Sequence, residues 1–189
     1  MRLTWFVGFL ALAVSASVHA QTRPEQATPK GAARLHLESL RRGEYLTAAR
    51  TTHPARLRSN RQLFDSLLHH GKATYLAQRI FSLPDSAALV ALDDAAFTAG
   101  LFQFWYMQDR RGPLSVEYRD IDVNIVTAPR RDSAQVVYRW LVHPDSLPLQ
   151  SFNVQTMVRC GTAWCAALMG DYRNLARLLA EPMVPIRTK

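Results

Sequence analysis

The hydrophobic period of this 189-residue chain changes from helical to alternating at Gly112-Pro113. Before this point, apolar residues recur every three or four positions, the spacing that gives a helix one apolar face. After it, apolar residues such as Ile121 and Val123 alternate with polar ones, the spacing of a half-buried strand. Helices followed by a run of strands with short turns predict the α+β class, with the helices packed on an antiparallel sheet.

Helical segments are expected from their apolar spacing and end signals over residues 29–42, 45–49, 54–71, 75–81, 84–92 and 95–108. The first begins at Thr28-Pro29, and either Asp93 or Asp94 caps the last one. This last helix is apolar around most of its circumference, with Phe97 and Trp105 on one of its apolar faces. We therefore expect it to be central and covered on more than one side.

Strands are expected over residues 120–125, 135–143, 151–160 and 164–169. Asp171 can cap a final helix that extends through Leu179. The predicted fold is α+β, with N-terminal helices packed on a four-stranded antiparallel meander and a short C-terminal helix. The second strand is apolar on both faces, which fits either helices on both sides or a partner on one.

The first 20 residues are typical of a cleaved signal peptide. Arg2 precedes an apolar run, and Val18-His19-Ala20 is a small-x-small ending suited to signal peptidase. The run is about 12 residues long, against the roughly 20 that span a bilayer, so cleavage near Ala20 is favoured over an uncleaved anchor. We expect an exported protein, periplasmic or secreted, without a transmembrane segment in the mature chain. Its parts would be a flexible leader (21–30), one domain (31–180) and a tail (181–189).

Cys160 and Cys165 are the only cysteines, and in an oxidising compartment pairing is the default. They flank Gly161-Thr162-Ala163, between the third and fourth predicted strands. In a hairpin the two residues would lie opposite each other on one face, at a separation that a disulfide can close. A structural disulfide is favoured over a redox pair, because the spacing is not Cys-x-x-Cys.

The formal net charge is +8. Such a charge can favour nucleic acid or anionic surfaces, but here the arginines are spread along the chain, with the densest stretch between Arg34 and Arg61. A solvated helical face is the favoured interpretation, with attachment to an anionic envelope surface as an alternative. Export argues further against a nucleic-acid partner.

Three segments resemble the nuclear-transport-factor-2-like superfamily, whose cone-shaped α+β fold is shared with ketosteroid isomerase-like proteins. They are the opening helix running into Leu40-Arg41-Arg42-Gly43-Glu44-Tyr45-Leu46, then Val136-Val137-Tyr138-Arg139-Trp140, and Gly161-Thr162-Ala163-Trp164-Cys165-Ala166-Ala167-Leu168. The resemblance covers residues 31–180 and implies a curved sheet that encloses a pocket, and a homodimer through the outer face of the sheet. It does not imply activity, because one fold hosts enzymes and binders, and no catalytic residue is carried over.

Polar residues on the first two predicted strands are the best pocket candidates, because a pocket needs a few convergent polar groups among apolar ones. Asp120 and Asp122 share one strand face, and aromatic residues nearby could form the floor of a pocket. The candidate ligand-binding residues are Tyr118, Asp120, Asp122, Tyr138, Arg139 and Trp140. The alternative is a solvated strand edge beside ordinary core aromatics.

No metal site, cofactor site or catalytic residue is predicted. His69 and His70 point about 100° apart on a helix, so they suit the helix C-terminus better than a shared ion. His36, on an apolar stripe, is expected to be a core or boundary histidine rather than a ligand. Ligand spacings such as His-Glu-x-x-His and nucleophile motifs such as Gly-x-Ser-x-Gly are absent from the sequence.

These observations favour a non-enzymatic exported domain that binds a small apolar ligand or a protein partner. The alternative is a small isomerase or dehydratase in which Asp120 or Asp122 has a raised pKa inside a pocket.

Overall fold

The computed structural model describes residues 23–69, 72–111, 117–127, 131–143 and 149–167, together with residues 172, 176 and 177. The predicted signal peptide, the tail and most of the predicted final helix lie outside these residues.

The helical half begins with a short 3-10 helix, η1, followed by α-helices that overlap the predicted segments, with ends that differ from the expected ones by at most three residues. Their bounds are η1 (Pro24–Ala27), α1 (Pro29–Arg42), α2 (Tyr45–Arg50), α3 (Pro54–His69), α4 (Ala73–Arg79), α5 (Ser86–Val90) and α6 (Asp94–Arg111).

Side-chain oxygens cap several of these helices, which is why they begin where the sequence predicts. Thr28 Oγ1 accepts from the Gly31 N–H at 3.1 Å, and Asp85 Oδ1 accepts from the Ala88 N–H at 2.8 Å. Of the two candidate N-cap residues for α6, Asp93 caps the helix, because its Oδ1 accepts a hydrogen bond from the Ala96 N–H at 2.6 Å.

The segment expected as a flexible leader differs from that expectation where the structure describes it. Pro24–Ala27 form η1, and the Gln26 side chain donates to the Trp164 carbonyl at 3.4 Å. Proline favours this local structure because its ring fixes φ near the helical value.

The sheet has four strands in the order β1-β2-β3-β4, each antiparallel to the next. Their bounds are β1 (Glu117–Thr127), β2 (Ser133–His143), β3 (Leu149–Cys160) and β4 (Ala163–Ala166). The α+β class, with helices and an antiparallel sheet, is therefore confirmed. β4 begins one residue earlier than predicted and is shorter than predicted.

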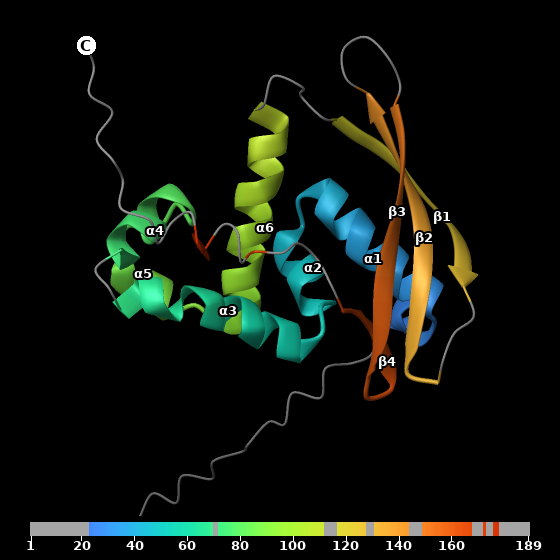
Figure 1. Ribbon diagram of the computed structural model, residues 1–189, viewed down its shortest axis with the longest axis horizontal. Helices are drawn as coiled ribbons and strands as arrows, with labels where there is room; N and C mark the ends of the chain where they lie inside the picture. Colours follow the sequence, from blue (N-terminus) through green and yellow to red (C-terminus); the bar gives the residue numbers. More distant parts are fainter. Residues whose placement is uncertain are drawn as a thin grey trace, which may run out of the picture.

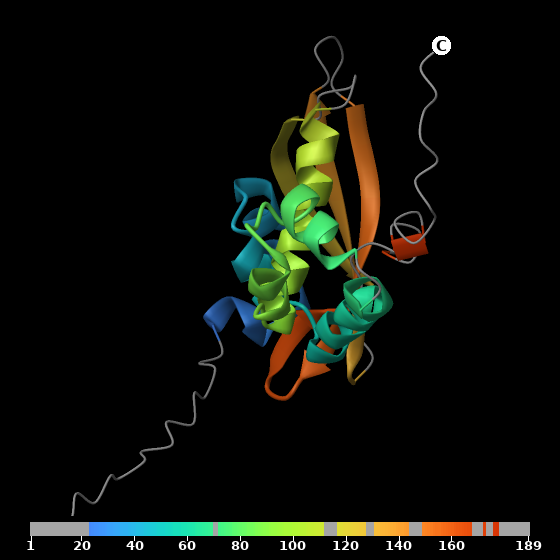
Figure 2. The same cartoon turned by 90° about the vertical axis from the view of Figure 1, so that its left-hand side faces the viewer.

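The molecule is layered, with α1 against the sheet and the other helices beyond α1 (Figure 1). Ala33 and Leu37 of α1 pack with Val123, Val136 and Met157 of the sheet, and all five are fully buried. α6 contacts α2 and α3 in the helical layers, and Figure 2 shows the helices in front of the sheet when viewed from their side. This arrangement leaves the opposite face of the sheet without a helix among the described elements.

A second core joins the helices to one another. Phe97 of α6 lies 5.6 Å from Phe64 and 4.7 Å from Phe81, measured between ring centroids. The expected central position of this helix agrees with that packing, although Trp105 is 51% exposed. Among the described helices, none is both long and apolar enough to cross a membrane.

Candidate functional site

The face of the sheet under α1, here called the inner face, is filled by packed side chains. Val136 and Met157 are fully buried, Tyr138 is buried, and Trp164 lies under the Arg159 guanidinium, which is 4.5 Å from the ring centroid. Within the described residues, this face is therefore a packed core and not a pocket.

The strand register separates the candidate ligand-binding residues. Asp122 pairs with Arg139, whereas the next pair along is Val123 with Tyr138. Because successive residues of a strand belong to opposite faces, Tyr138 is on the inner face and Arg139 is on the other. Asp122 and Arg139 are thus directly opposite each other on neighbouring strands, whereas Tyr138 is on the other face of the sheet.

The remaining candidates are placed only by their backbone positions. Asp120 pairs with Leu141 and Tyr118 with Val142, with a register shift between these two pairs. Trp140 pairs with Ile121, one position from the Asp122 pair. The side chains of Tyr118, Asp120, Asp122 and Trp140 lie outside the description, so their role in a pocket stays a prediction.

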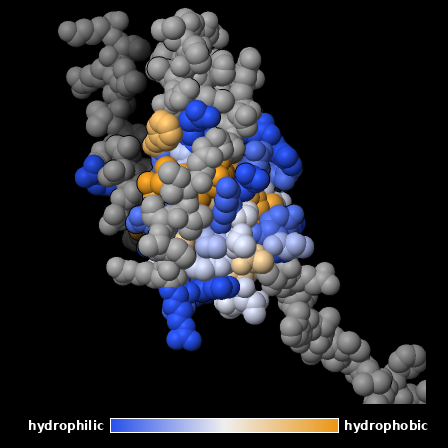
Figure 3. Space-filling model, turned by 90° about the vertical axis from the view of Figure 1, so that its right-hand side faces the viewer, coloured by the Kyte–Doolittle hydropathy of each residue, from blue (hydrophilic) through white to orange (hydrophobic). Residues whose placement is uncertain are grey.

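The face of the sheet that points away from α1, here called the outer face, exposes large apolar side chains. Phe152 is 68% exposed and Val154 is 57% exposed. Their partners on β2 are Arg139 and Val137, both half-buried. Figure 3 views the molecule from the sheet side, where hydrophobic residues (orange) lie across the middle among hydrophilic ones (blue).

β3 has an inverted polarity in this region. Its polar residues Asn153 and Gln155 belong to the inner face, and Gln155 is 2% exposed, with its side-chain amide donating to the Thr156 carbonyl at 3.0 Å. Alternation alone would place Phe152 and Val154 in the core, since apolar residues normally occupy the buried face. Buried polar groups cost free energy unless they are hydrogen-bonded, and the hydrogen bond of Gln155 meets that condition, so what this orientation leaves to explain is the exposure of Phe152 and Val154.

The exposed pair Phe152 and Val154 was not among the residues that sequence reasoning selected. The sequence does contain a signal for this pair. Phe152 and Val154 belong to one face of β3 and Met157 to the other, so the strand carries apolar residues on both faces. A strand that is apolar on both faces is expected to be buried on both faces.

Two shallow grooves occur among the described residues. The first, of about 420 Å³, lies between the start of α3 and the sheet and is lined by His53, Ala55, Arg56, Ser59, Val158 and Ala167. The second, of about 340 Å³, lies between α2, α6 and the α4–α5 connection and is lined mostly by apolar residues. Both are broadly open to solvent.

His36 is a core histidine, as predicted. It is fully buried, and its Nδ1 lies 3.0 Å from the Ala48 carbonyl oxygen and 2.8 Å from Thr51 Oγ1. Burial lowers its pKa from 6.5 to about 4, because the charged imidazolium would be taken out of water. The neutral ring thus links α1 to α2, and its Nε2 has no hydrogen-bond partner among the described residues.

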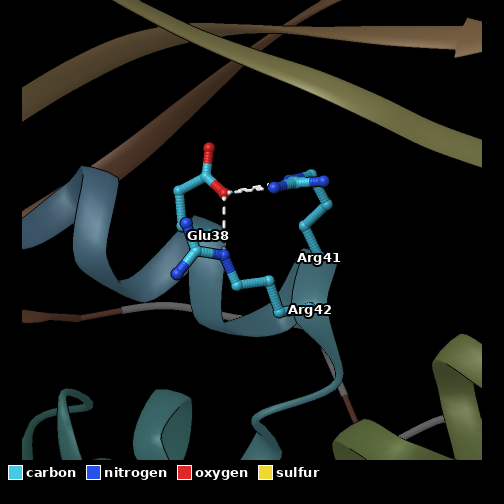
Figure 4. Close-up of polar contacts among 3 residues, drawn as sticks. All are labelled: Glu38, Arg41 and Arg42. Carbon is cyan, nitrogen blue, oxygen red and sulfur yellow. Dashed lines mark hydrogen bonds and ion pairs between the residues drawn. The ribbon is translucent and has the colours of Figure 1, made fainter.

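Arginines of the helical region are engaged in local contacts. On α1, the Glu38 carboxylate forms ion pairs with Arg41 at 2.9 Å and with Arg42 at 3.7 Å (Figure 4). Arg61 donates to the carbonyls of Leu92 and Val90 at 2.7 and 3.0 Å. These contacts give Arg41, Arg42 and Arg61 a structural role. The other arginines of this stretch are exposed, as expected of a solvated helical face: Arg34, Arg50, Arg56 and Arg58.

Cys160 and Cys165 form a disulfide, as predicted. Their geometry differs from the expectation that they lie directly opposite. Cys160 pairs with Ala163, and Cys165 pairs with Val158, so the bridge is diagonal on one face, with Cα atoms 6.0 Å apart. The reason is a two-residue turn at Gly161-Thr162, where Gly161 takes a φ of 65° that glycine adopts without strain.

No group of three or more His, Cys, Asp or Glu residues in the described part of the chain is arranged to hold a metal ion. Comparison of the chain with protein families, curated proteins and solved structures gave no match in any of the three.

Proposed function

We propose that this protein is an exported, non-enzymatic domain that binds a protein partner through the outer face of its sheet. The observation that carries the proposal is the outward orientation of Phe152 and Val154, 68% and 57% exposed, on a strand whose residues Asn153 and Gln155 belong to the inner face. Contiguous exposed apolar groups on an otherwise polar surface are typical of interaction sites.

The shape of the surface favours a protein over a small ligand. Pockets for small molecules are concave and bury roughly 70–90% of the ligand surface, whereas the outer face is the broad side of a sheet. The described grooves are open, and the inner face at Tyr138 is filled by side chains. A partner that presents apolar side chains would complete the burial of the outer face.

Export and the nuclear-transport-factor-2-like architecture, including a curved sheet, are parts of the same proposal. The Cys160–Cys165 disulfide supports export, because such bonds persist mainly in oxidising compartments. The α+β layering supports the architecture.

The test is a photo-crosslink in the cells that make the protein. Phe152→p-benzoylphenylalanine replaces one exposed aromatic residue by a photoreactive one, and Val90→p-benzoylphenylalanine is the control, since Val90 is 57% exposed on α5. We expect illumination to give a discrete protein adduct at position 152 and none at position 90. Equal yields at the two positions, or no adduct at position 152, would contradict the proposal.

A further inference from the structure

One border of the sheet has no neighbouring strand along most of its length in the part of the chain that the structure describes. β3 spans Leu149–Cys160, but the short β4 pairs only with Met157–Cys160. The residues of β3 before Met157 therefore have a β2 neighbour on one side and, among the described strands, none on the other. In Figures 1 and 2, β3 runs along one border of the sheet beyond the β4 hairpin.

The hydrogen bonds at the ends of β3 show which backbone groups point to the open border. The Arg159 N–H donates to the Asp132 carbonyl, on the β2 side, at 3.0 Å, while the Thr156 carbonyl accepts from Ala167, on the β4 side, at 2.8 Å. Because backbone groups alternate in direction along a strand, those of Phe152 and Val154 point to the open border. No backbone hydrogen bond crosses the border from either residue within the described part of the chain.

The border has none of the usual protection against pairing. Natural edge strands carry charges, prolines or bulges that prevent another strand from adding. The segment Leu-Gln-Ser-Phe-Asn-Val-Gln-Thr-Met-Val, residues 149–158, contains no charged residue, proline or glycine. Its open backbone groups belong to Phe152 and Val154, which are also the exposed apolar residues of the outer face.

We propose that a second copy of this chain adds its β3 to this border, antiparallel and about a twofold axis at Asn153. In this register Phe152 of each copy lies opposite Val154 of the other. Each such pair exchanges two backbone hydrogen bonds, because both residues direct their N–H and C=O groups across the border. The inference goes beyond the proposed function, because strand addition places Phe152 and Val154 of the two copies side by side but extends the sheet and does not itself cover the outer face.

Self-complementarity is what favours a second copy over a different protein. A twofold interface requires one patch to match itself, and the two exposed apolar residues are two positions apart, so one register pairs both of them. An aromatic residue opposite a β-branched one is a favourable cross-strand pair. The absence of charge in residues 149–158 also removes like-charge contact between copies at the border.

The test is sedimentation equilibrium of the full mature chain with its disulfide intact, on wild type and two matched variants. Val154→Lys places a charge on the border, and Val90→Lys places the same charge on α5 at the same 57% exposure. We expect a dimer for wild type and Val90→Lys, and a dissociation constant for Val154→Lys that is raised roughly tenfold or more. A wild-type monomer at all concentrations, or equal effects of the two variants, would overturn the inference.

A second variant tests the register without weakening the border. Asn153→Cys places the two thiols of a dimer at the twofold axis. Residue 153 of each copy would there form a pair that exchanges no backbone hydrogen bonds, and in such pairs the Cα atoms are about 4.5 Å apart. This distance is short enough for a disulfide. Thr156→Cys is the control, because that register keeps it away from its own copy. We expect a covalent dimer joined through position 153 alone, and equal crosslinking of the two variants would exclude the register.

These outcomes separate the inference from the proposed function. A monomer whose position-152 photo-crosslink yields a different protein would overturn the second copy and support the binding surface. A monomer without any position-specific adduct would overturn both.

Discussion

His36 is a fully buried titratable side chain at the junction of α1 and α2. Its Nδ1 contacts Thr51 and the Ala48 carbonyl, and its pKa is lowered to about 4 by burial. In the unfolded chain the imidazole takes up a proton below about pH 6.5. The unfolded state therefore binds more protons than the native state between about pH 6.5 and pH 4.

The sign of the pH dependence follows. His36 leaves stability intact above about pH 6.5 and lowers it progressively as the pH falls towards 4, by about 3 kcal/mol in total. His36→Asn, whose amide can replace the Nδ1 donor, should lose this part of the pH dependence. Urea unfolding at neutral pH and near pH 4.5 measures it, with His53→Asn as the control at a half-buried histidine. If the free energy of unfolding of His36→Asn falls as much between neutral pH and pH 4.5 as that of the wild type, His36 is not the source of the pH dependence.

Gly100 of α6 lies against the ring of Phe81. Helix propensity alone predicts that Gly100→Ala stabilises α6 by about 1 kcal/mol. A Cβ at this position would, however, lie 2.6 Å from Phe81 Cε1, and this ring is itself packed against Phe97. We expect overpacking to dominate, with a net loss of about 1–2 kcal/mol in the free energy of unfolding. Chemical denaturation decides between the two effects, since a raised midpoint would mean that Phe81 moves aside without cost.

At the scale of elements, the β3–β4 hairpin is held by the diagonal bridge between Cys160 and Cys165, which encloses a sequence separation of 5 residues. A loop this short removes little entropy from the unfolded chain, so the bridge should stabilise the domain by about 2 kcal/mol. Replacing both cysteines by alanine should lower the unfolding midpoint accordingly while leaving the circular dichroism spectrum unchanged. A midpoint that is identical with and without the bridge would contradict this value.

Element types were predictable because each has a local cause. The start of α1 follows from Thr28-Pro29, and α5 and α6 follow from the caps Asp85 and Asp93. The hairpin turn was less predictable, because the choice between two and three turn residues depends on the register with β3. A one-residue change there moves the cysteines from opposite to diagonal positions.

The candidate site was less predictable than the fold, because it depends on which face each strand residue occupies. Tyr138 and Arg139 are neighbours in sequence, yet they lie on opposite faces of the sheet. For β3, alternation predicts the wrong face for Phe152 and Val154, since long-range packing of Met157 and Gln155 on the inner face sets the phase of the strand. Only the three-dimensional structure supplies that phase.

At the scale of the whole molecule, the charge of the chain gives the proposed association a definite salt dependence. The formal net charge of the chain is +8, so two copies repel each other at long range. Salt screens this repulsion over a Debye length of about 10 Å at 0.1 M, while the uncharged border between the copies is little affected. Sedimentation at low and high salt should therefore show stronger dimerisation at high salt, and dissociation by salt would instead indicate an interface held by charge.

The layered architecture places all described helices on one side of the sheet, and no described element covers the outer face of β3 or its border before Met157. We propose that a partner binds at β3, and pairing with a second copy requires this border to be accessible. Residue-resolved amide hydrogen exchange tests the claim most directly, because the N–H of Phe152 points to the border and that of Asn153 points to β2. In dilute protein, Phe152 should exchange much faster than Asn153, and at high concentration the Phe152 amide should become protected. Slow exchange of Phe152 at every concentration would mean that the chain itself already covers the border, and would contradict the account.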